Sequence, residues 1–310
     1  MIDFSEQKNF VQDLMTQLSF PFDAQKTFIN SLDRISGSKM ASAWFSSLLQ
    51  QYDESERCSY EQMLAHVKAM SEAIGIHEYT VSLLLFLCMA KKLRSRYLEC
   101  GIDESVWYNS LLDLRYKLNE CRSVYGINGS FVSWWFPGFF NLTRFALCRL
   151  QFEVVTLAKE YIIGDKTLPA GSKAINIHIP RTGTKLDHQE VLESYRLAAE
   201  MFAHEFKSQP IVFTCTSWLL DPWILTALPP TSNLVEFHKD FKIVESTNYN
   251  DYKSIMLVLF DRSGTENTAN LPKDTSLRRA YAERIERGEP AAQGKGFFIY
   301  QDGKIENMMI

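Results

Sequence analysis

Residues 174–206 read AINIHIPRTGTKLDHQEVLESYRLAAEMFAHEF, and this stretch decides the fold of the chain around it. Apolar and polar side chains alternate over residues 174–179, as they do in a strand with one buried face. Apolar residues then recur at helical spacing after Asp187, which forms a capping-box pattern with Glu190. The sequence therefore predicts a strand, a loop over residues 180–186 and a helix, in that order.

Further strands and helices alternate on both sides of this unit. The apolar runs predict a strand or bent hairpin strand at 145–157, strands at 211–216, 241–245 and 254–260, and a terminal hairpin at 295–305 turned at Asp302-Gly303. Helices are predicted at 233–240 and 276–287. Strands interleaved with helices are typical of α/β or α+β layer structures.

The first 123 residues instead read as helix throughout, with little glycine or proline and no strand alternation. Ser59 and Gln62 form a capping box that opens one of these helices, and Gly75 ends it. The fold class is therefore α+β, with an all-helical N-terminal bundle over residues 1–123 and a mixed-sheet α/β domain over residues 124–310.

The composition is that of a globular protein of about two domains. The chain has 310 residues, of which 46% are hydrophobic and 23% charged, and a formal net charge of −4. The longest uncharged apolar run, at 79–90, is too short to span a membrane, and the N-terminus lacks the features of a secretory signal. Six scattered cysteines without metal-like spacing indicate reduced, buried thiols. We expect a cytoplasmic protein that binds neither nucleic acid nor membranes.

Aromatic residues crowd into residues 130–140, which read SFVSWWFPGFF. This segment can be an aromatic binding or dimerisation surface, which leaves a homodimer open. It can also be a buried seam between the two domains. We favour the seam, because large aromatic side chains stabilise a fold mostly through the area that they bury.

The loop after the 174–179 strand has the groups that hold a phosphate. Arg181 and Lys185 supply positive charge, Thr182 and Thr184 supply hydroxyls, and Gly183 permits a turn with positive φ or a close ligand approach. The free amides at the start of the next helix add further donors, although the N-cap carboxylate of that helix competes for them. The residues leave two interpretations open: a cradle for the pyrophosphate of a pantetheine cofactor, or an ordinary tight loop with a capping box.

Three segments resemble the bacterial acyltransferase-domain proteins. They are FVSWWFPGFFNLTRFALCRLQFE at 131–153, INIHIPRTGTKLDHQEVLESYRLAAEMF at 175–202 and FTCTSWLL at 213–220, and the resemblance spans about residues 20–300. It implies a helical N-terminal domain, a GNAT-like C-terminal domain and an N-acyltransferase that uses acyl-CoA or acetyl-CoA as co-substrate.

The signatures of the GNAT superfamily are matched only in part. Its acyl-CoA loop reads [RQ]-x-x-G-x-[GA]; Arg181 takes the first position, but Gly183 comes one position early and the final small residue is missing. The segment NLVEFHKDF at 233–241 resembles a shortened form of a second signature. This likeness places His238 where the superfamily has a proton-donating tyrosine, with a spacing that is three residues short.

Direct acyl transfer to an amine requires a base for the incoming ammonium, a donor for the carbonyl oxygen and an acid for the leaving thiolate. Glu153, after an apolar strand, and His178, on the polar side of its strand, are the candidate bases. His238 is the candidate acid, and Ser217 and Trp218 are candidate substrate contacts.

Each catalytic candidate also has a structural interpretation. Glu153 can pair with Arg144 or Arg149. His178 can form a hydrogen bond to a neighbouring strand, and His238 can be a solvated residue of a helix. Cys215 is a poor nucleophile candidate because it lies mid-strand without a basic neighbour. The sequence motifs of zinc, ATP and dinucleotide sites are missing, so we expect no metal.

Three functions remain open from the sequence. The first is an acyl-CoA-dependent N-acyltransferase that acts on a small-molecule or peptide amine. The second is a non-catalytic GNAT-like binding module, in which Leu186 or Trp218 plugs the cleft. The third is a scaffold or dimerisation protein with an exposed aromatic face at 131–140. An open cleft between the two central parallel strands, walled by residues 181–184, favours the first.

Overall fold

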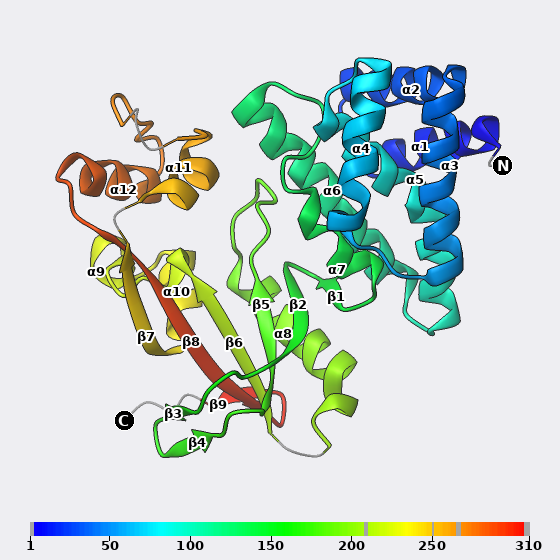
Figure 1. Ribbon diagram of the computed structural model, residues 1–310. Coiled ribbons are helices and arrows are strands. Elements are labelled where there is room, and N and C mark those ends of the chain that lie inside the picture. The colour runs from blue at the N-terminus through cyan, green and yellow to red at the C-terminus, as the bar shows by residue number, and fades with distance from the viewer. Residues whose placement is uncertain (1–2, 208–209, 250, 265–267, 307–310) are drawn as a thin grey trace. The chain divides into compact units, whose positions relative to one another are not determined.

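The computed structural model describes residues 3–207, 210–249, 251–264 and 268–306, and the chain forms two compact units (Figure 1). The first unit is Met1–Phe145 and the second is Ala146–Ile310. The division follows residue 145 rather than residue 123, so the aromatic segment belongs to the first unit. Helices followed by a mixed sheet confirm the predicted α+β fold class.

The first unit is helical, as predicted. Its helices are α1 (Phe4–Gln17), α2 (Phe22–Gly37), α3 (Lys39–Ser55), α4 (Tyr60–Ile74), α5 (Glu78–Glu99), α6 (Glu104–Tyr125), η1 (Ser133–Trp135) and α7 (Pro137–Phe140). Every residue of α5 from Thr80 to Ala90 is buried, which explains the uninterrupted apolar run. Gly75 ends α4 with a φ of 61°, as predicted, whereas the side chain of Ser59 at the start of α4 makes no capping hydrogen bond.

The aromatic segment packs inside the first unit. The Phe136 and Phe140 rings lie 5.0 and 4.9 Å from the Phe86 ring of α5, measured between centroids. Phe139 is also buried, whereas Trp134 is 60% exposed. The segment is therefore not the continuous exposed aromatic face that a scaffold function required.

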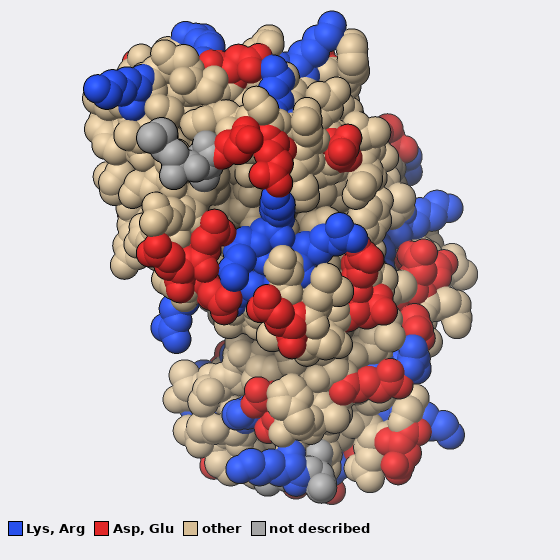
Figure 2. Space-filling view, turned by 90° about the vertical axis from the view of Figure 1, so that its right-hand side faces the viewer, with Lys and Arg blue, Asp and Glu red and all other residues tan. Residues whose placement is uncertain are grey.

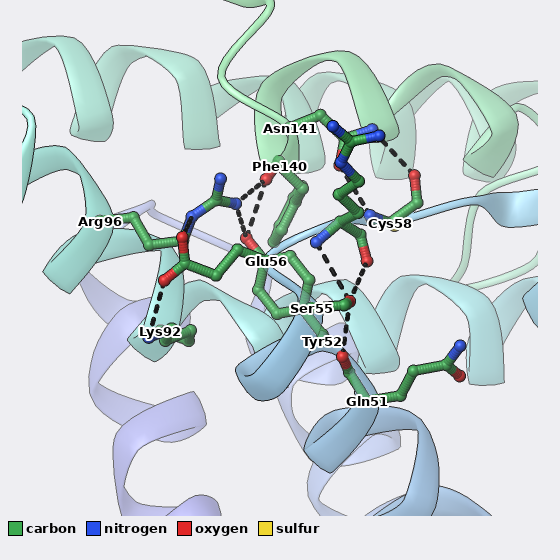
Figure 3. Close-up of polar contacts among 10 residues, drawn as sticks. Gln51, Tyr52, Ser55, Glu56, Cys58, Lys92, Arg96, Phe140 and Asn141 are labelled. Carbon is green, nitrogen blue, oxygen red and sulfur yellow. Dashed lines mark hydrogen bonds and ion pairs between the residues drawn. The ribbon is translucent and has the colours of Figure 1, made fainter.

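A buried polar cluster ties the end of this segment to α3 and α5 (Figure 3). Arg96, only 8% exposed, donates to the Phe140 carbonyl oxygen and to the Tyr52 hydroxyl, which itself donates to the same carbonyl at 2.9 Å. Beside them, the Asn141 side chain accepts from the Cys58 amide and donates to the Cys58 carbonyl. Each buried polar group of the cluster is thus satisfied by a group that is distant in sequence.

Tyr52→Phe tests this cluster. The variant removes one hydroxyl but leaves the Arg96 bond to the Phe140 carbonyl in place. We expect the free energy of unfolding of the first unit to fall by about 1 kcal/mol, the usual net value of one hydrogen bond. Urea unfolding of Tyr52→Phe beside Tyr108→Phe, which removes an exposed hydroxyl, measures the difference. Equal losses in the two variants would contradict the assignment.

The second unit is built on a mixed sheet. Its strands are β2 (Leu150–Thr156), β3 (Tyr161–Ile163), β4 (Lys166–Leu168), β5 (Lys173–His178), β6 (Ile211–Ser217), β7 (Lys242–Tyr249), β8 (Ala291–Gln301) and β9 (Lys304–Glu306), and β1 (Arg144–Leu147) crosses the boundary between the units. The main sheet has the order β1-β2-β5-β6-β8-β7, with β9 beside β8, and β3 pairs with β4. The helices are α8 (His188–Phe202), η2 (Ala203–Glu205), η3 (Trp218–Leu220), α9 (Ile224–Ala227), α10 (Asn233–Lys239), α11 (Lys253–Phe260) and α12 (Ser276–Glu286).

The two central strands, β5 and β6, are parallel and separate early. Their ladder consists of Ile175 with Phe213 and Asn176 with Thr214, and the described residues beyond these pairs do not pair across the gap. The helix α8 covers one face of the sheet, where the Tyr195 ring packs against the Phe213 ring at 5.6 Å. The other face therefore carries Asn176 and the residues that alternate with it.

Most strands and helices of the second unit lie where the sequence predicts them. The hairpin at residues 145–157 is confirmed as β1 and β2, and Asp302-Gly303 turns β8 into β9 with φ angles of 51° and 76°. The predicted strand at 254–260 is wrong, because these residues form α11. Ile255, Met256 and Phe260 of α11 are buried against a core shared with α12. The short β3–β4 hairpin was not predicted.

The surface carries mixed charges, and Figure 2 shows lysine and arginine side chains interspersed with aspartate and glutamate. Within the described ranges, no single helix is long and apolar enough to cross a membrane; α4 and α5 pass that test only as a pair bent by 117°. All six cysteines are free thiols, and four of them are buried; Cys100 and Cys148 are exposed, so the predicted burial is wrong for these two.

Candidate functional site

A cavity of about 650 Å³ opens where β5 and β6 separate. Its walls are the loop after β5, the residues directly after β6, the segment that leads into α10, the end of α11 and the start of α12. Leu186 and Trp218 line this cavity without filling it. Residues 181–184 form part of its wall, which is the arrangement that the enzyme interpretation requires.

The lining of the cavity is positively charged. Arg149, Arg181, Lys185 and Arg278 line it, and none of the described lining residues is an aspartate or glutamate. This contrasts with the whole chain, which has a net charge of −4. Arg181 and Arg278 pair with Asp261, and Arg278 also pairs with Asp274, but neither aspartate lines the cavity. The wall therefore keeps a surplus of positive charge, which favours a ligand with several negative charges.

The loop after β5 presents backbone donors. Gly183 has a φ of 83°, and a Cβ at this position would meet no atom within 4 Å, so the backbone is open to an approaching group. In the described part of the chain, the amides of Gly183, Lys185 and Leu186 donate no hydrogen bond. Asp187 caps the amides of Gln189 and Glu190 instead. The N-cap carboxylate thus leaves the loop amides available to an anion.

Arg149 holds this loop in shape. It is 9% exposed, and its guanidinium donates to the Lys185 carbonyl at 3.3 Å and to the Pro180 carbonyl at 3.2 Å. The sequence suggested Arg149 as an ion-pair partner of Glu153 and gave no sign of this contact, because the bonded carbonyls lie more than 30 residues away.

The start of α8 is fixed by a buried carboxylate. Asp240, at the end of α10, contacts the His188 ring at 3.0 Å and accepts from the Tyr195 hydroxyl at 3.2 Å. Burial raises the pKa of Asp240 to about 6. These contacts anchor the helix whose first turn follows the phosphate-type loop.

Two arginines of the cavity share one carboxylate. Arg181 makes a bidentate ion pair with Asp261, with N–O distances of 2.7 and 3.1 Å, and Arg278 lies 3.6 Å from the same carboxylate. Neither Arg278 nor Asp261 was among the predicted site residues, because both lie in a segment of unassigned function.

Glu153, Asn176 and His178 form a polar cluster on the sheet face opposite α8. Glu153 pairs with Asn176 across the β2–β5 ladder, and its Oε1 lies 2.7 Å from His178 Nε2. Asn176 Nδ2 lies 3.1 Å from the same ring nitrogen and 3.5 Å from Oε1. The Glu153 and His178 side chains are 21% and 22% exposed.

This cluster has the groups of a general base. In the tautomer with the proton on Nε2, the ring donates to the Glu153 carboxylate and Nδ1 is the basic nitrogen, while the Asn176 amide donates to Glu153 Oε1 rather than to the ring. The carboxylate also stabilises the imidazolium that forms when the ring takes up a proton. His178 directly precedes Ile179 and Pro180 in the cavity wall. The structure thus brings two of the three predicted catalytic residues together, and Asn176, which the sequence did not single out, joins them.

His238 lies elsewhere. It is 3% exposed on α10 and lines a separate cavity of about 670 Å³, and its Nε2 has no hydrogen-bond partner in the described part of the structure. Burial lowers the pKa of His238, which favours the neutral ring. The alternative that His238 is a solvated helix residue is therefore wrong, and its role as an acid stays a prediction.

The remaining candidate residues, in β6 and directly after it, differ in whether they reach the cavity. Trp218 lines the cavity, whereas the Ser217 hydroxyl accepts from the Leu219 amide at 3.1 Å and caps η3. Cys215 is buried, and burial raises the pKa of its thiol to about 12. A thiol with such a pKa does not form the thiolate that covalent acyl transfer requires.

Comparisons with known proteins agree with this architecture. The model of the N-acyltransferase N-terminal domain family matches residues 9–142, and that of the GNAT-like C-terminal domain family matches residues 144–298. No curated protein matches the chain.

Several solved acyltransferase structures share the fold. An acyltransferase in complex with decanoyl-CoA and teicoplanin is 20% identical, with a TM-score of 0.70 over 94% of this chain and 88% of that chain. A variant acyltransferase in complex with octanoyl-CoA is 21% identical, with a TM-score of 0.71 and the same coverage. Another, with CoA and 10C-teicoplanin, is 20% identical, with a TM-score of 0.69 over 93% and 86%. Together the two family matches run from residue 9 to residue 298, so this chain belongs to the family that joins an N-acyltransferase N-terminal domain to a GNAT-like C-terminal domain.

Proposed function

We propose that this protein is an N-acyltransferase that moves an acyl group from acyl-CoA directly to an amine. The observation that carries the proposal is the cavity between β5 and β6, whose lining has four cations, no carboxylate among the described residues and a loop with unbonded amides. CoA carries a diphosphate and a phosphomonoester, which match these groups. The acyltransferases of the same fold that were solved with CoA or acyl-CoA support this assignment.

The loop is assigned to the phosphates of the co-substrate. Arg181 and Lys185 supply charge, Thr182 and Thr184 supply hydroxyls, and Gly183 lets the backbone approach the ligand. The pantetheine arm is assigned to the gap between β5 and β6, where the strand edges no longer bond to each other. Its two amide groups can pair with such edges, and Trp218 then lies beside the arm as an apolar contact.

His178 is assigned as the base and Glu153 as the carboxylate that orients it. His178 takes a proton from the ammonium of the acceptor, and the free amine attacks the thioester carbonyl carbon. The C–S bond then breaks, the imidazolium returns its proton to the leaving thiolate and the nitrogen loses its second proton to solvent, so that the products are an amide, CoA with its free thiol and one released proton. No covalent enzyme intermediate is required, in agreement with the buried Cys215 thiol.

For the acceptor we propose an amine-bearing small molecule or peptide. Two of the solved acyltransferases of this fold were crystallised with teicoplanin or 10C-teicoplanin, which makes glycopeptides reasonable first candidates for this chain. The six free cysteines support a reducing, cytoplasmic setting.

Calorimetric titration with CoA, acetyl-CoA and octanoyl-CoA tests the co-substrate. We expect the parent protein to bind and Arg181→Ala/Thr184→Ala to bind about tenfold or more weakly, because charge-assisted hydrogen bonds to phosphate are lost. Arg196→Ala is the matched control, since it removes one arginine from α8 outside this cavity. Absence of binding of all three ligands to the parent protein would contradict the proposed function.

A further inference from the structure

The long connection between β7 and β8 adds a wall to the co-substrate cavity. These two strands are antiparallel neighbours in the sheet, and a two-residue turn is sufficient to join such a pair. The chain instead uses residues 250–290, which contain α11 and α12. The end of α11 and the start of α12 line the cavity through Val258, Leu259 and residues 275–278. The connection therefore shapes a ligand site rather than merely closing the sheet.

This wall and the loop after β5 meet in one cluster of charged side chains. Asp261, which directly follows α11, contacts both Arg181 and Arg278, and the three side chains are 27%, 28% and 23% exposed. Arg278 is held further by its Nε, which donates to the Leu259 carbonyl at 2.8 Å, and by Asp274. Each guanidinium has five N–H donors, so donors remain on both after these contacts.

Two sets of anion-binding groups thus line one cavity. The first set is the backbone amides of the loop, with Lys185 beside them. The second set is the pair of guanidiniums oriented by Asp261. CoA has two anionic centres, a diphosphate and a 3′-phosphate, and the 3′-phosphate is a monoester that carries close to two negative charges at neutral pH. Guanidinium groups bind such a group with paired hydrogen bonds, which backbone amides of a turn match less well.

We propose that Arg181 and Arg278 bind the 3′-phosphate of CoA and that Asp261 is the positioning residue for both arginines. This inference rests on the proposed function, because it places one end of the co-substrate assigned above. It makes the β7–β8 connection the element that distinguishes CoA from its analogue without the 3′-phosphate. The Arg181–Asp261 ion pair then positions a phosphate-binding group, in addition to joining the loop after β5 to the β7–β8 connection.

The experiment compares the affinities of CoA and dephospho-CoA by calorimetry. The parent protein is expected to bind CoA about tenfold or more tightly than dephospho-CoA, because two charge-assisted contacts are lost without the 3′-phosphate. Arg278→Gln is expected to weaken CoA binding about tenfold and to leave dephospho-CoA binding unchanged. Asp261→Asn is expected to reduce the preference for CoA in the same direction. Arg279→Gln is the matched control, since this exposed arginine on the same helix does not line the cavity.

Dephospho-CoA binding serves as the folding check in every variant. Arg278→Lys provides a second check, because it keeps the charge but loses the paired donors and should give an intermediate preference. The preference should also shrink below about pH 6, where the phosphomonoester takes up its second proton.

Equal affinity of the parent protein for the two ligands would overturn the inference and leave the proposed function standing. Equal loss of both affinities in Arg278→Gln would overturn it as well. A stronger preference in Asp261→Asn would show that Asp261 competes with the phosphate instead of positioning the arginines. Absence of binding of either ligand would instead overturn the proposed function itself.

Discussion

Replacing His178 by alanine is expected to lower kcat of acyl transfer by about 10²- to 10⁴-fold, the range that a general base contributes. The ring contacts Glu153 at 2.7 Å and directly precedes the wall of the cavity, and alanine removes the only nitrogen atoms of this side chain that can take up a proton. The affinity for CoA should change little, because the proposed phosphate contacts are with the loop after β5 and Arg278 and not with the ring. The measurement is kcat and KM with an amine acceptor, together with calorimetry of CoA.

Two further variants separate the chemistry from the fold. Glu153→Gln keeps the size of the side chain but removes the negative charge that stabilises an imidazolium, so kcat should also fall while CoA affinity is kept. His204→Ala is the matched control, since its side chain is 73% exposed on η2 of the same unit. An unchanged kcat in His178→Ala would exclude this histidine as the base.

The structural features that the sequence predicted correctly are those that depend on residues close together in the chain. The strand, loop and helix at residues 174–206 follow from alternation, a glycine and a capping aspartate, and each of these acts within a few residues. The loop between the strand and the helix was predictable for the same reason, whereas its role in binding phosphate stays a prediction. His178 could be placed on the polar face of its strand. Its contact with Glu153 depends on the register between β2 and β5, and the sequence of one strand does not determine how it pairs with another.

The rest of the site depends on distant contacts. Residues 254–260 form an apolar run that suits a strand as well as a helix, and only the core shared with α12 selects the helix. The contacts of Arg149, Asp261 and Arg278 could not be predicted, because nothing local indicates which carbonyl or carboxylate each side chain meets. Histidine is a residue type that can act as a general acid, which made His238 a candidate. Its burial on α10 results from packing within the folded unit and could not be predicted from the neighbouring residues.

Asp221→Asn is expected to lower the free energy of unfolding of the second unit by about 3–5 kcal/mol. Asp221 is 2% exposed and pairs with Arg284, which is 7% exposed, at 2.6 Å. It also accepts from the amides of Trp223 and Ala292. The two amides donate to different carboxylate oxygens, so an asparagine, with one side-chain oxygen, can accept from only one of them. It also leaves the Arg284 guanidinium charged and buried without its counter-ion. Thermal and urea unfolding of the full chain measure the loss.

The matched control is Glu289→Gln, which breaks the exposed ion pair with Arg287 and should cost at most about 1 kcal/mol. The double variant Asp221→Asn/Arg284→Met distinguishes the cause. If the loss arises from a lone buried charge, removing that charge should restore part of the stability, because buried ion pairs can be replaced by apolar side chains at small cost. If the double variant is less stable than Asp221→Asn, the Arg284 contacts with the Pro290 carbonyl and the Trp223 ring contribute more than the ion pair itself.

Helix α12 links this ion pair to the cavity. Arg284 lies near the C-terminal end of the helix, and Arg278 lies near its N-terminal end in the cavity wall, so the ion pair anchors the end away from the cavity. A partly unfolded α12 should therefore weaken CoA binding before the sheet unfolds, and calorimetry of Asp221→Asn with CoA over a temperature series would detect that order.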